Sequence, residues 1–585
     1  MIKLLKNMRP KEIIMSIICV IFVLGQIYFD LSLPDYMTEL TTLLKTPNTD
    51  VSSLMNVGLK MILCTLCSAV LDISCGFLSS KVASGFSYEL RRRLFHNVID
   101  LSKQDMQNFS IPSLITRTTN DITQIQMIVS MGLQMIIKAP VMAIWAVIKI
   151  LNKSWELSVV TLGFVVVICI SVFLIMSTCL PRFRKVQKLT DKINKVTREN
   201  LTGISVVHAF NAEEYQNEKF EKANKEMNDL QLKNQKLFAL MQPMMSLSMN
   251  GLSLVIYWLG AILINNIAIE NVADRLTMFS NVIVFSTYAT YVVMSFMMLV
   301  MIFMMLPQAQ VSAERINEVL STKTSIKEGL LTEGNKVGTV EFKNVNFRYP
   351  NSKEDELENI NFKIEQGQTL AIIGATGSGK TTLISLISRF YDATSGEVLI
   401  DGENVKNYTF DSLYNKIGYV TQKAMLFSGT IEDNVFFGES NQDKNEDNLA
   451  NALEISQAKE FVDKLDDKEN YKIAQLGRNV SGGQKQRISI ARAIARKPEI
   501  LIFDDSFSAL DYKTDAKLRE ELNTKEKDTT KIIVAQRIST IRHADKIIVL
   551  DNGKMVGYDT HDNLMKNCSV YQEIAYSQLS KEELN

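Results

Sequence analysis

Long apolar runs fill roughly the first 310 positions of the chain, and short segments of alternating character follow them. A helix that crosses the hydrocarbon core of a membrane needs about 20 apolar residues. Six segments of this chain reach that length with few charges. They predict membrane-spanning helices at residues 13–33, 54–78, 128–151, 157–180, 240–265 and 278–305.

Basic residues are distributed unequally among the segments that connect these spans. The amino terminus, residues 79–127 and residues 181–239 together hold 22 Lys and Arg residues, whereas the other connections hold three. By the positive-inside rule, both termini and the two long connections face the cytoplasm. Because structureless loops of this length are unusual and Gly and Pro are scarce in them, we expect the spans to continue as helices. This predicts an all-α membrane domain at residues 1–306 with long cytoplasmic helical extensions.

The pattern changes after a connector at residues 307–339, which contains several glycines. Val340–Phe347 alternates apolar and polar side chains with period two, which is typical of a strand. Short strand-like runs then alternate with helix-like runs to the end of the chain. Such alternation is typical of an α/β domain with a mostly parallel sheet, which we place at residues 340–585.

Charge and cysteine content exclude some classes of function. The chain carries 64 Lys and Arg residues against 64 Asp and Glu residues, so its formal net charge is zero. Binding to a nucleic-acid backbone requires a surplus of basic residues, which argues against DNA or RNA as a partner. Six of the seven cysteines lie in apolar runs without metal-ligand spacing, so we interpret them as small apolar residues.

A glycine-rich loop stands between a predicted strand at Leu370–Ile373 and a predicted helix. Its glycines allow backbone N–H groups to face phosphate oxygens, Lys380 can reach the outer phosphates, and Thr381 offers a hydroxyl to Mg²⁺. Asp504 ends the apolar run Ile500–Phe503 and suits a magnesium ligand. We therefore expect a P-loop NTPase domain with ATP and Mg²⁺ as cofactors. The ATP-binding loop and helix start comprise Gly374, Ala375, Thr376, Gly377, Ser378, Gly379, Lys380, Thr381 and Thr382.

The segment Val480–Gln484 resembles the signature motif of the ATP-binding cassette (ABC) transporters. Together with six spans before the nucleotide domain, it makes the whole chain similar to a half-transporter of the exporter fold. The resemblance implies that two nucleotide domains pair head to tail, with each ATP between one P-loop and the partner's signature. It implies adenine stacking by Tyr349, a magnesium or water contact by Gln422, a D-loop position for Asp511, and γ-phosphate contacts in trans by Ser481, Gly482, Gly483 and Gln484.

Four residues at three places in the chain depart from the pattern of that family. The residue after Asp504 is normally a Glu that polarises the attacking water, but here it is Asp505, whose carboxylate stops one methylene short. The family's switch histidine is replaced by Gln536, which hydrogen-bonds but carries no charge. A positioned base accelerates a reaction about 10²–10⁴-fold, so we expect ATP to be bound here but hydrolysed slowly. Ala474–Gln475 replaces the usual Gly-Glu of exporters, which predicts an altered contact with the membrane helices.

This combination resembles the degenerate-site subunit of heterodimeric bacterial multidrug or lipid exporters. The resemblance implies a homologous half-transporter with the consensus Glu and His as partner, membrane lipid around the spans and a small amphipathic molecule as substrate. The Lys and Asn content and the methionine-rich membrane core are compatible with the bacterial plasma membrane as the location. Three alternatives stay open: a homodimeric drug, lipid, haem or peptide exporter, an ATP-gated channel or regulator, and an importer for siderophore- or vitamin-sized molecules.

The membrane half contains further candidate functional features. Helix-compatible patches at Ser113–Asp121 and Thr197–Asn211 lie deep in the cytoplasmic connections, where the family has coupling helices that dock on the nucleotide domains. The last span, residues 278–305, is rich in methionine and aromatic residues, which suit a pocket for many shapes, helix packing or lipid contact. A charge within a span costs about 2.5–3.5 kcal/mol, so we expect Asp72 and Lys138 to face a polar cavity or one another.

Overall fold

A computed structural model describes residues 2–45, 50–151, 153–268, 271–350, 352–438 and 442–578. The chain divides into two compact units. Met1–Val98 and Ile111–Ser321 form a helical unit, and Ile99–Ser110 with Thr322–Asn585 form an α/β unit. The predicted order of six apolar helices followed by a sheet-containing domain is confirmed. The domain boundaries at residues 306 and 340 stay a prediction.

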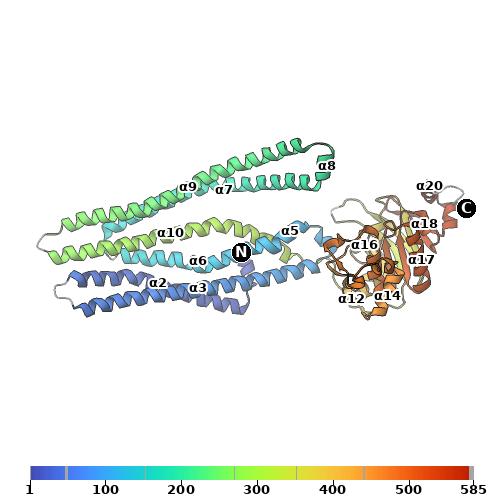
Figure 1. The fold of residues 1–585 in the computed structure, drawn as a ribbon, viewed down its shortest axis with the longest axis horizontal. Coiled ribbons are helices and arrows are strands. Elements are labelled where there is room, and N and C mark those ends of the chain that lie inside the picture. The colour runs from blue at the N-terminus through green and yellow to red at the C-terminus, as the bar shows by residue number, and fades with distance from the viewer. Residues whose placement is uncertain are drawn as a thin grey trace. The chain divides into compact units, whose positions relative to one another are not determined.

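Six long helices lie side by side in the helical unit (Figure 1). Each contains an apolar stretch long enough to cross a membrane, so this is a multi-pass membrane protein. Most of them extend well beyond the apolar stretch, as the scarcity of Gly and Pro in the connections predicts. Their bounds are α2 Pro10–Lys45, α3 Val51–Asp100, α6 Ile122–Leu151, α7 Trp155–Thr202, α9 Glu213–Asn265 and α10 Val272–Ser321.

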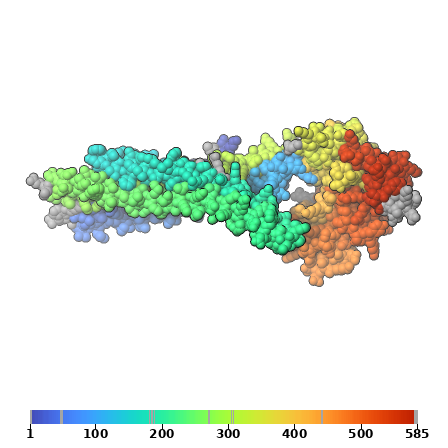
Figure 2. Space-filling model, turned by 90° about the horizontal axis from the view of Figure 1, so that it is seen from above, coloured from blue at the N-terminus to red at the C-terminus, as the bar shows by residue number. Residues whose placement is uncertain are grey.

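The helices α7 and α9 pack against each other, and Figure 2 shows both at the surface of the helical unit. A short helix, α8 (Ile204–Ala209), joins them. The patch expected from the sequence at Thr197–Asn211 therefore forms the end of α7 and the whole of α8. This connection is helical along almost all of its length.

The first long connection is organised differently from the sequence expectation. Its patch Ser113–Asp121 belongs to α5 (Ile111–Thr116) and a π-helical turn, η1 (Arg117–Asp121), which lead directly into α6. The residues of this connection that group with the α/β unit are instead 99–110. They contain a separate short helix, α4 (Lys103–Met106), which begins where the Ser102 hydroxyl accepts a hydrogen bond from the Asp105 N–H at 3.2 Å.

Charged residues within the spans pair between helices. The Lys138 Nζ atom of α6 lies 3.8 Å from Asp30 Oδ2 of α2, and Lys149 Nζ lies 2.6 Å from Asp35 Oδ2. Pairing offsets part of the cost of placing a charge in the membrane. Of the two arrangements expected for Asp72 and Lys138, a polar cavity or a mutual contact, the mutual contact is not formed, because α2 supplies a carboxylate to Lys138 while Asp72 is exposed on α3.

One ten-stranded sheet forms the α/β unit, in the order β5-β4-β1-β2-β12-β11-β3-β10-β9-β6. The five strands from β11 to β6 run parallel, and β1 pairs antiparallel with β2 and β4. A separate two-stranded sheet joins β7 and β8. The strands are β1 Val340–Phe347, β2 Leu357–Ile364, β3 Thr369–Gly374, β4 Ser395–Ile400, β5 Glu403–Asn404, β6 Ile417–Val420, β7 Gly429–Thr430, β8 Lys472–Ile473, β9 Ile500–Asp504, β10 Thr530–Val534, β11 Lys546–Asp551 and β12 Lys554–Asp559.

Both faces of the parallel strands are buried. In β3, Leu370 and Ile372 belong to one apolar cluster, whereas Ala371 and Ile373 belong to another. Alternate side chains of a strand point to opposite faces of the sheet, so a strand that is apolar throughout must be covered on both sides. The longer helices that accompany the sheet are α11 Lys380–Ile387, α12 Phe410–Lys416, α14 Glu446–Ile455, α16 Gly482–Ala495, α17 Tyr512–Lys525, α19 His561–Asn567 and α20 Ser569–Gln578.

Candidate nucleotide site

Neighbouring parallel strands bring the predicted site residues together. β3 ends at Gly374, β9 ends at Asp504 and β10 ends at Val534, and β10 lies between the other two. The carboxyl ends of parallel strands meet at one edge of the sheet. The P-loop, the pair Asp504–Asp505 and the switch residue Gln536 therefore lie at the same edge, although about 160 residues separate them in the chain.

Glycine is required by the backbone in the loop that follows β3. Gly377 and Gly379 have φ angles of +84° and +94°, which residues with a side chain rarely adopt. A Cβ atom added to Gly377 would meet no described atom within 4 Å. Packing within the chain therefore does not explain this glycine, whereas the loop conformation does, and the space beside it is open to a phosphate group.

Lys380 lies over the same loop. Its ammonium group donates hydrogen bonds to the carbonyl oxygens of Gly374 at 2.9 Å and Ala375 at 2.7 Å. Burial lowers the pKa of Lys380, and the nearby carboxylates of Asp505 and Asp504 oppose that shift. The ammonium can exchange these carbonyl oxygens for phosphate oxygens without leaving the loop.

Thr381 and Asp504 supply the oxygens of a candidate magnesium site. The hydroxyl of Thr381 donates to Asp504 Oδ1 at 3.1 Å, and the hydroxyl of Tyr419 donates to Asp504 Oδ2 at 3.3 Å. Burial raises the pKa of the Asp504 carboxyl, and these two hydrogen bonds oppose the shift. Hydroxyl and carboxylate oxygens are ligands that Mg²⁺ prefers, so this pair fits the ion, which would neutralise phosphate charge when bound.

Asp505 is held by amide groups on both sides. Its Oδ2 atom accepts hydrogen bonds from Gln536 Nε2 at 2.8 Å and Gln422 Nε2 at 3.3 Å. Its backbone has φ of 49°, and its N–H donates to the Val534 carbonyl at 3.1 Å. The structure therefore brings three predicted site residues into direct contact. These two amide donors occupy the oxygen that a water molecule would otherwise contact.

The sequence did not indicate the residue that holds the switch segment. The side-chain amide of Gln578, in α20, donates to the Gln536 carbonyl at 2.7 Å and accepts from the Ile538 N–H at 2.9 Å. One side chain thus holds the backbone on both sides of Arg537. A polar residue on an exposed helix face is ordinary in a sequence, so no pattern could have singled out Gln578.

Tyr349 lies beside the helix that follows the P-loop. Its hydroxyl is 2.8 Å from the Thr382 hydroxyl. Its ring packs edge-to-face against Phe347 at 4.8 Å and against Tyr391 at 5.3 Å between centroids. A half-buried ring that is fixed on two sides is suited to stack on a nucleotide base. The sequence did not indicate that Tyr391 contacts this ring, because Tyr391 is 2% exposed and resembles an ordinary core residue.

The signature residues open α16. The Ser481 hydroxyl accepts from the Gln484 N–H at 3.3 Å, and the Gln484 side chain accepts from the Ser481 N–H at 2.9 Å. This capping box occupies two backbone donors. A Cβ atom on Gly482 would meet no described atom within 4 Å, and its φ is not positive. Neither packing nor backbone conformation within the described chain therefore requires glycine at this position.

Asp511 has a local role at the D-loop position. Its carboxylate accepts from the Thr514 N–H at 3.0 Å and from the Thr514 hydroxyl at 2.7 Å, and it caps α17. In the adjoining segment, Ser508 donates to the Asp505 carbonyl at 2.8 Å. The segment between Asp505 and α17 is thus fixed at both of its ends.

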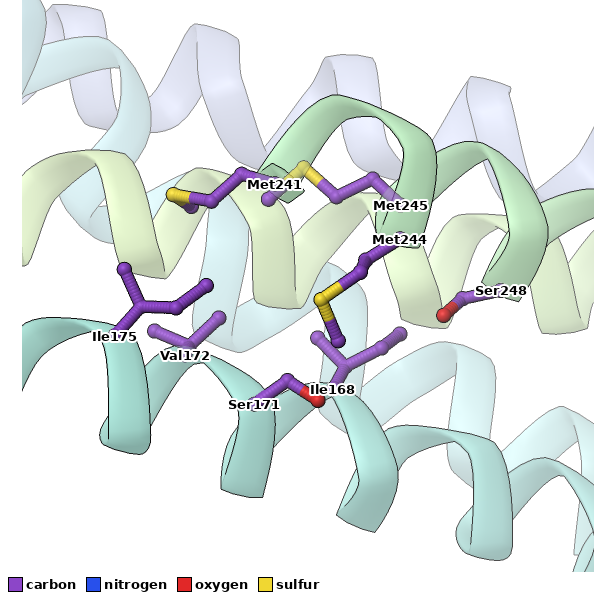
Figure 3. Close-up of a pocket in the computed structure, with 8 residues that line it drawn as sticks. All are labelled: Ile168, Ser171, Val172, Ile175, Met241, Met244, Met245 and Ser248. Carbon is purple, nitrogen blue, oxygen red and sulfur yellow. The ribbon is translucent and has the colours of Figure 1, made fainter. Parts of the chain in front are cut away.

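The helical unit has a small cavity between α7 and α9 (Figure 3). Its enclosed space is ≈ 20 Å³, which is room for about one water molecule. Figure 3 shows that Met241 and Met245 lie along α9, whereas Met244 extends toward Ile168 and Ser171 of α7. This cavity is lined by Ile168, Ser171, Val172, Ile175, Met241, Met244, Met245 and Ser248, and by no residue of the methionine-rich span 278–305.

Comparisons with known proteins identify the family. The ABC transporter transmembrane region matches residues 14–296, and the ABC transporter domain matches residues 357–508. An uncharacterized ABC transporter ATP-binding protein of Mycobacterium tuberculosis is 38% identical over 534 residues, which cover 90% of each chain. The chain belongs to the ABC transporters. Its nucleotide domain implies ATP binding, usually with Mg²⁺, and ATP-driven transport, so the resemblance found in the sequence is confirmed.

Other relatives of this ABC transporter agree in architecture. YfiB of Bacillus subtilis, also an uncharacterized ABC transporter ATP-binding protein, is 35% identical over 530 residues and 90% of each chain. The ATP-dependent lipid A-core flippase of Shigella flexneri is 30% identical over 526 residues, covering 89% of this chain and 87% of the flippase. A solved structure of a bacterial Atm1-family ABC exporter with ATP bound has a TM-score of 0.81 at 22% identity and covers 98% of both chains. The fold is thus that of an ABC exporter.

Proposed function

We propose that this ABC transporter is one half of a heterodimeric exporter in the bacterial plasma membrane, with both termini in the cytoplasm. ATP binding closes the paired nucleotide domains and turns the substrate cavity outward, and hydrolysis resets the transporter. The P-loop of this chain holds ATP at a degenerate site, where hydrolysis is slow. Its signature motif completes the competent site, which lies on the P-loop of the partner.

The observation that carries this proposal is the environment of Asp505. Its Oδ2 atom accepts from both Gln422 and Gln536, and neither amide can take a proton from water at neutral pH. A positioned base is worth about 10²–10⁴-fold in rate. In contrast, Lys380, Thr381 and Asp504 retain the groups that hold phosphate and Mg²⁺. The site keeps its binding groups and lacks a strong base.

The signature side supports the second part of the proposal. Gly482 leaves open space at the start of α16, where backbone N–H groups and the helix dipole favour an anion. The capping box uses the N–H groups of Ser481 and Gln484 within the chain. The Gly482 and Gly483 N–H groups, together with the Ser481 hydroxyl, are therefore the donors that we assign to the γ-phosphate of the partner's ATP.

We propose that the transported substrate is an amphipathic small molecule, either a drug or a lipid. Two observations support this class. The membrane helices α6 and α2 carry the ion pair Lys138–Asp30 within otherwise apolar spans, which offers both polar and apolar contacts. The Shigella flexneri relative is named as a flippase of lipid A-core, which favours a lipid-like substrate.

ATPase assays on the purified chain and on its complex with a homologous half-transporter test this function. The chain alone should bind MgATP but hydrolyse it at least about 100-fold more slowly than the complex, because it lacks a positioned base. The second candidate is a homodimeric exporter, and the relationship to the flippase favours a lipid as its substrate. Equal turnover per subunit for the chain alone and for the complex would establish that candidate and exclude the heterodimer.

A further inference from the structure

The segment 99–110, called the loop segment below, contacts residues that border the nucleotide site. Gln107 Nε2 donates a hydrogen bond to the Tyr391 hydroxyl at 2.9 Å. The Lys103 ammonium lies 5.3 Å from the ring centroid of Phe390 and 5.9 Å from that of Tyr391. Both rings are therefore within cation–π range of one lysine.

A second contact anchors the loop segment to the chain that leads into the α/β unit. Asp105 Oδ2 accepts from the Ser325 N–H at 2.9 Å and from the Ser325 hydroxyl at 3.1 Å. Burial would raise the pKa of the Asp105 carboxyl, but hydrogen bonds from Ser102 and Ser325 outweigh burial and lower it. Asp105 is therefore charged at neutral pH. It holds the middle of the segment on Ser325, and Gln107, two residues further along, is held on Tyr391.

Tyr391 connects the loop segment to the adenine side of the nucleotide site. Its ring stands edge-on to the Tyr349 ring, with centroids 5.3 Å apart and an interplanar angle of 88°. Tyr349 in turn shares a hydrogen bond with Thr382 of the P-loop helix. Because Tyr391 is 2% exposed and interiors are closely packed, a ring shift at Tyr349 moves the hydroxyl that Gln107 binds.

We propose that Tyr391 is a positioning residue through which the nucleotide base bound at this site orders the loop segment. Adenine stacking fixes the Tyr349 ring, the fixed ring holds Tyr391, and Tyr391 holds Gln107. The contacts of this route lie on the base side and include none of Lys380, Thr381 or Asp504. ADP therefore orders the loop segment as well as ATP does. The inference rests on the proposed function only in requiring that this chain binds ATP through Tyr349.

At a site that hydrolyses ATP slowly, this route keeps the loop segment ordered throughout the transport cycle. A segment of the membrane domain's first connection stays ordered on the α/β unit as long as either nucleotide occupies the site. The γ-phosphate is not needed for this order, so the segment does not follow the hydrolysis cycle. The degenerate site then acts as a constant anchor for one half of the transporter.

A second set of contacts leads from the loop segment to the magnesium side and must be separated from the first. The Phe390 ring lies 5.3 Å from the Tyr419 ring, edge-to-face, and the Tyr419 hydroxyl donates to Asp504. Lys103 lies over Phe390. If these contacts coupled the site to the loop segment, a magnesium polyphosphate, which has no nucleobase, would order the segment.

Hydrogen exchange of the full-length chain in lipid nanodiscs separates the two routes. MgADP and MgATP should each slow exchange of the amides of residues 99–110 about five-fold or more, a typical size for coupling between sites. Magnesium tripolyphosphate at saturation should not slow it. Protection by tripolyphosphate equal to that by ADP would overturn the proposal in favour of the magnesium side.

Variants locate the route. Tyr391→Phe keeps the ring and removes the hydroxyl, and Gln107→Leu removes the donor, so each should abolish the protection by ADP. Coupling between two sites is reciprocal. Each variant should therefore weaken ADP binding by the same factor by which it reduces the protection of residues 99–110, while its affinity for tripolyphosphate stays unchanged. The matched control is Tyr408→Phe, which removes an equally buried hydroxyl bonded to the Ile400 carbonyl at 3.0 Å and should leave ADP protection intact.

The outcomes distinguish the inference from the proposed function. If the unmodified chain fails to bind ADP and ATP, the proposed function fails. If it binds ADP but the loop segment is not protected, or if Tyr391→Phe retains the protection, the inference alone fails. The double variant with Tyr391→Phe and Gln107→Leu should lose no more protection than either single variant, because both groups form one hydrogen bond.

Discussion

The P-loop side and the signature side of this ABC domain are built from similar elements, because each has a loop followed by the start of a helix. They differ in how many contacts their key residues make with the rest of the chain. On the P-loop side, Asp505 is buried and accepts from two amides of its own chain. On the signature side, Gly482 faces no described atom of its own chain. Under the proposed function, one chain has lost the groups that activate water and still presents the groups that a partner's ATP requires.

The largest expected effect comes from the signature side. Gly482→Asp places a carboxylate in the first turn of α16, which favours the helix but repels the γ-phosphate of the partner's ATP. We expect ATPase of the complex to fall by about 100-fold or more, with no loss of thermal stability in this chain. Asp505→Asn is the comparison and should change turnover much less. Equal losses would show that the two sides have been assigned the wrong roles.

The P-loop side should respond to restored chemistry. Asp505→Glu with Gln536→His supplies a longer carboxylate and an imidazole next to the existing contacts of Lys380, Thr381 and Asp504. Effects within one catalytic unit are strongly non-additive, so each single change should gain little. The double change should raise turnover by about ten-fold or more, a part of the usual effect of a base.

The measurement is ATPase of the complex after the partner's own catalytic Glu has been changed to Gln. Hydrolysis with the double substitution should clearly exceed the slow hydrolysis without it. Substantial turnover by the unmodified chain under these conditions would show that Asp505 and Gln536 are already competent, and the difference between the two sides would disappear.

A smaller effect is expected from the adenine side. Tyr349→Ala removes the ring that we assign to base stacking, and stacking is worth about 1–3 kcal/mol per base. ATP affinity of this chain should fall about ten-fold, as measured by equilibrium binding. Tyr349→Phe loses only the hydrogen bond to Thr382 and should stay close to the unmodified affinity. A large loss in the Phe variant would indicate that the hydroxyl, and not the ring, matters.

The smallest effect concerns pH. Burial raises the pKa of Asp504, so this carboxyl takes up a proton at a higher pH than an exposed aspartate does. As pH falls through that raised pKa, the charge that holds Mg²⁺ is lost, and the advantage of MgATP over metal-free ATP in binding should shrink. Asp504→Asn should bind both forms with a ratio that does not change with pH over this range. A pH-dependent ratio in that variant would place the titrating group elsewhere.

Local patterns were enough to predict much of the ABC domain. Strand, glycine loop and helix follow one another directly in the chain at β3, the P-loop and α11, so periodicity and a motif locate them. The same holds for the signature, where Ser481 and Gln484 are three residues apart and form a capping box. Contacts between residues far apart in sequence were harder to predict. The sequence left open whether Lys138 faces Asp72 or a polar cavity, and it did not indicate Asp30 as its partner.

Features that a short segment specifies through its own residues could be predicted from the sequence. Six apolar runs indicate membrane helices, because they are long and apolar enough to cross the hydrocarbon core. The departures from the family at Asp505 and Gln536 are likewise visible in the residues. The tertiary structure alone decided which groups meet. It placed Gln422 and Gln536 on one oxygen of Asp505 and Gln107 on Tyr391, because sheet order and packing bring together residues that no local pattern relates.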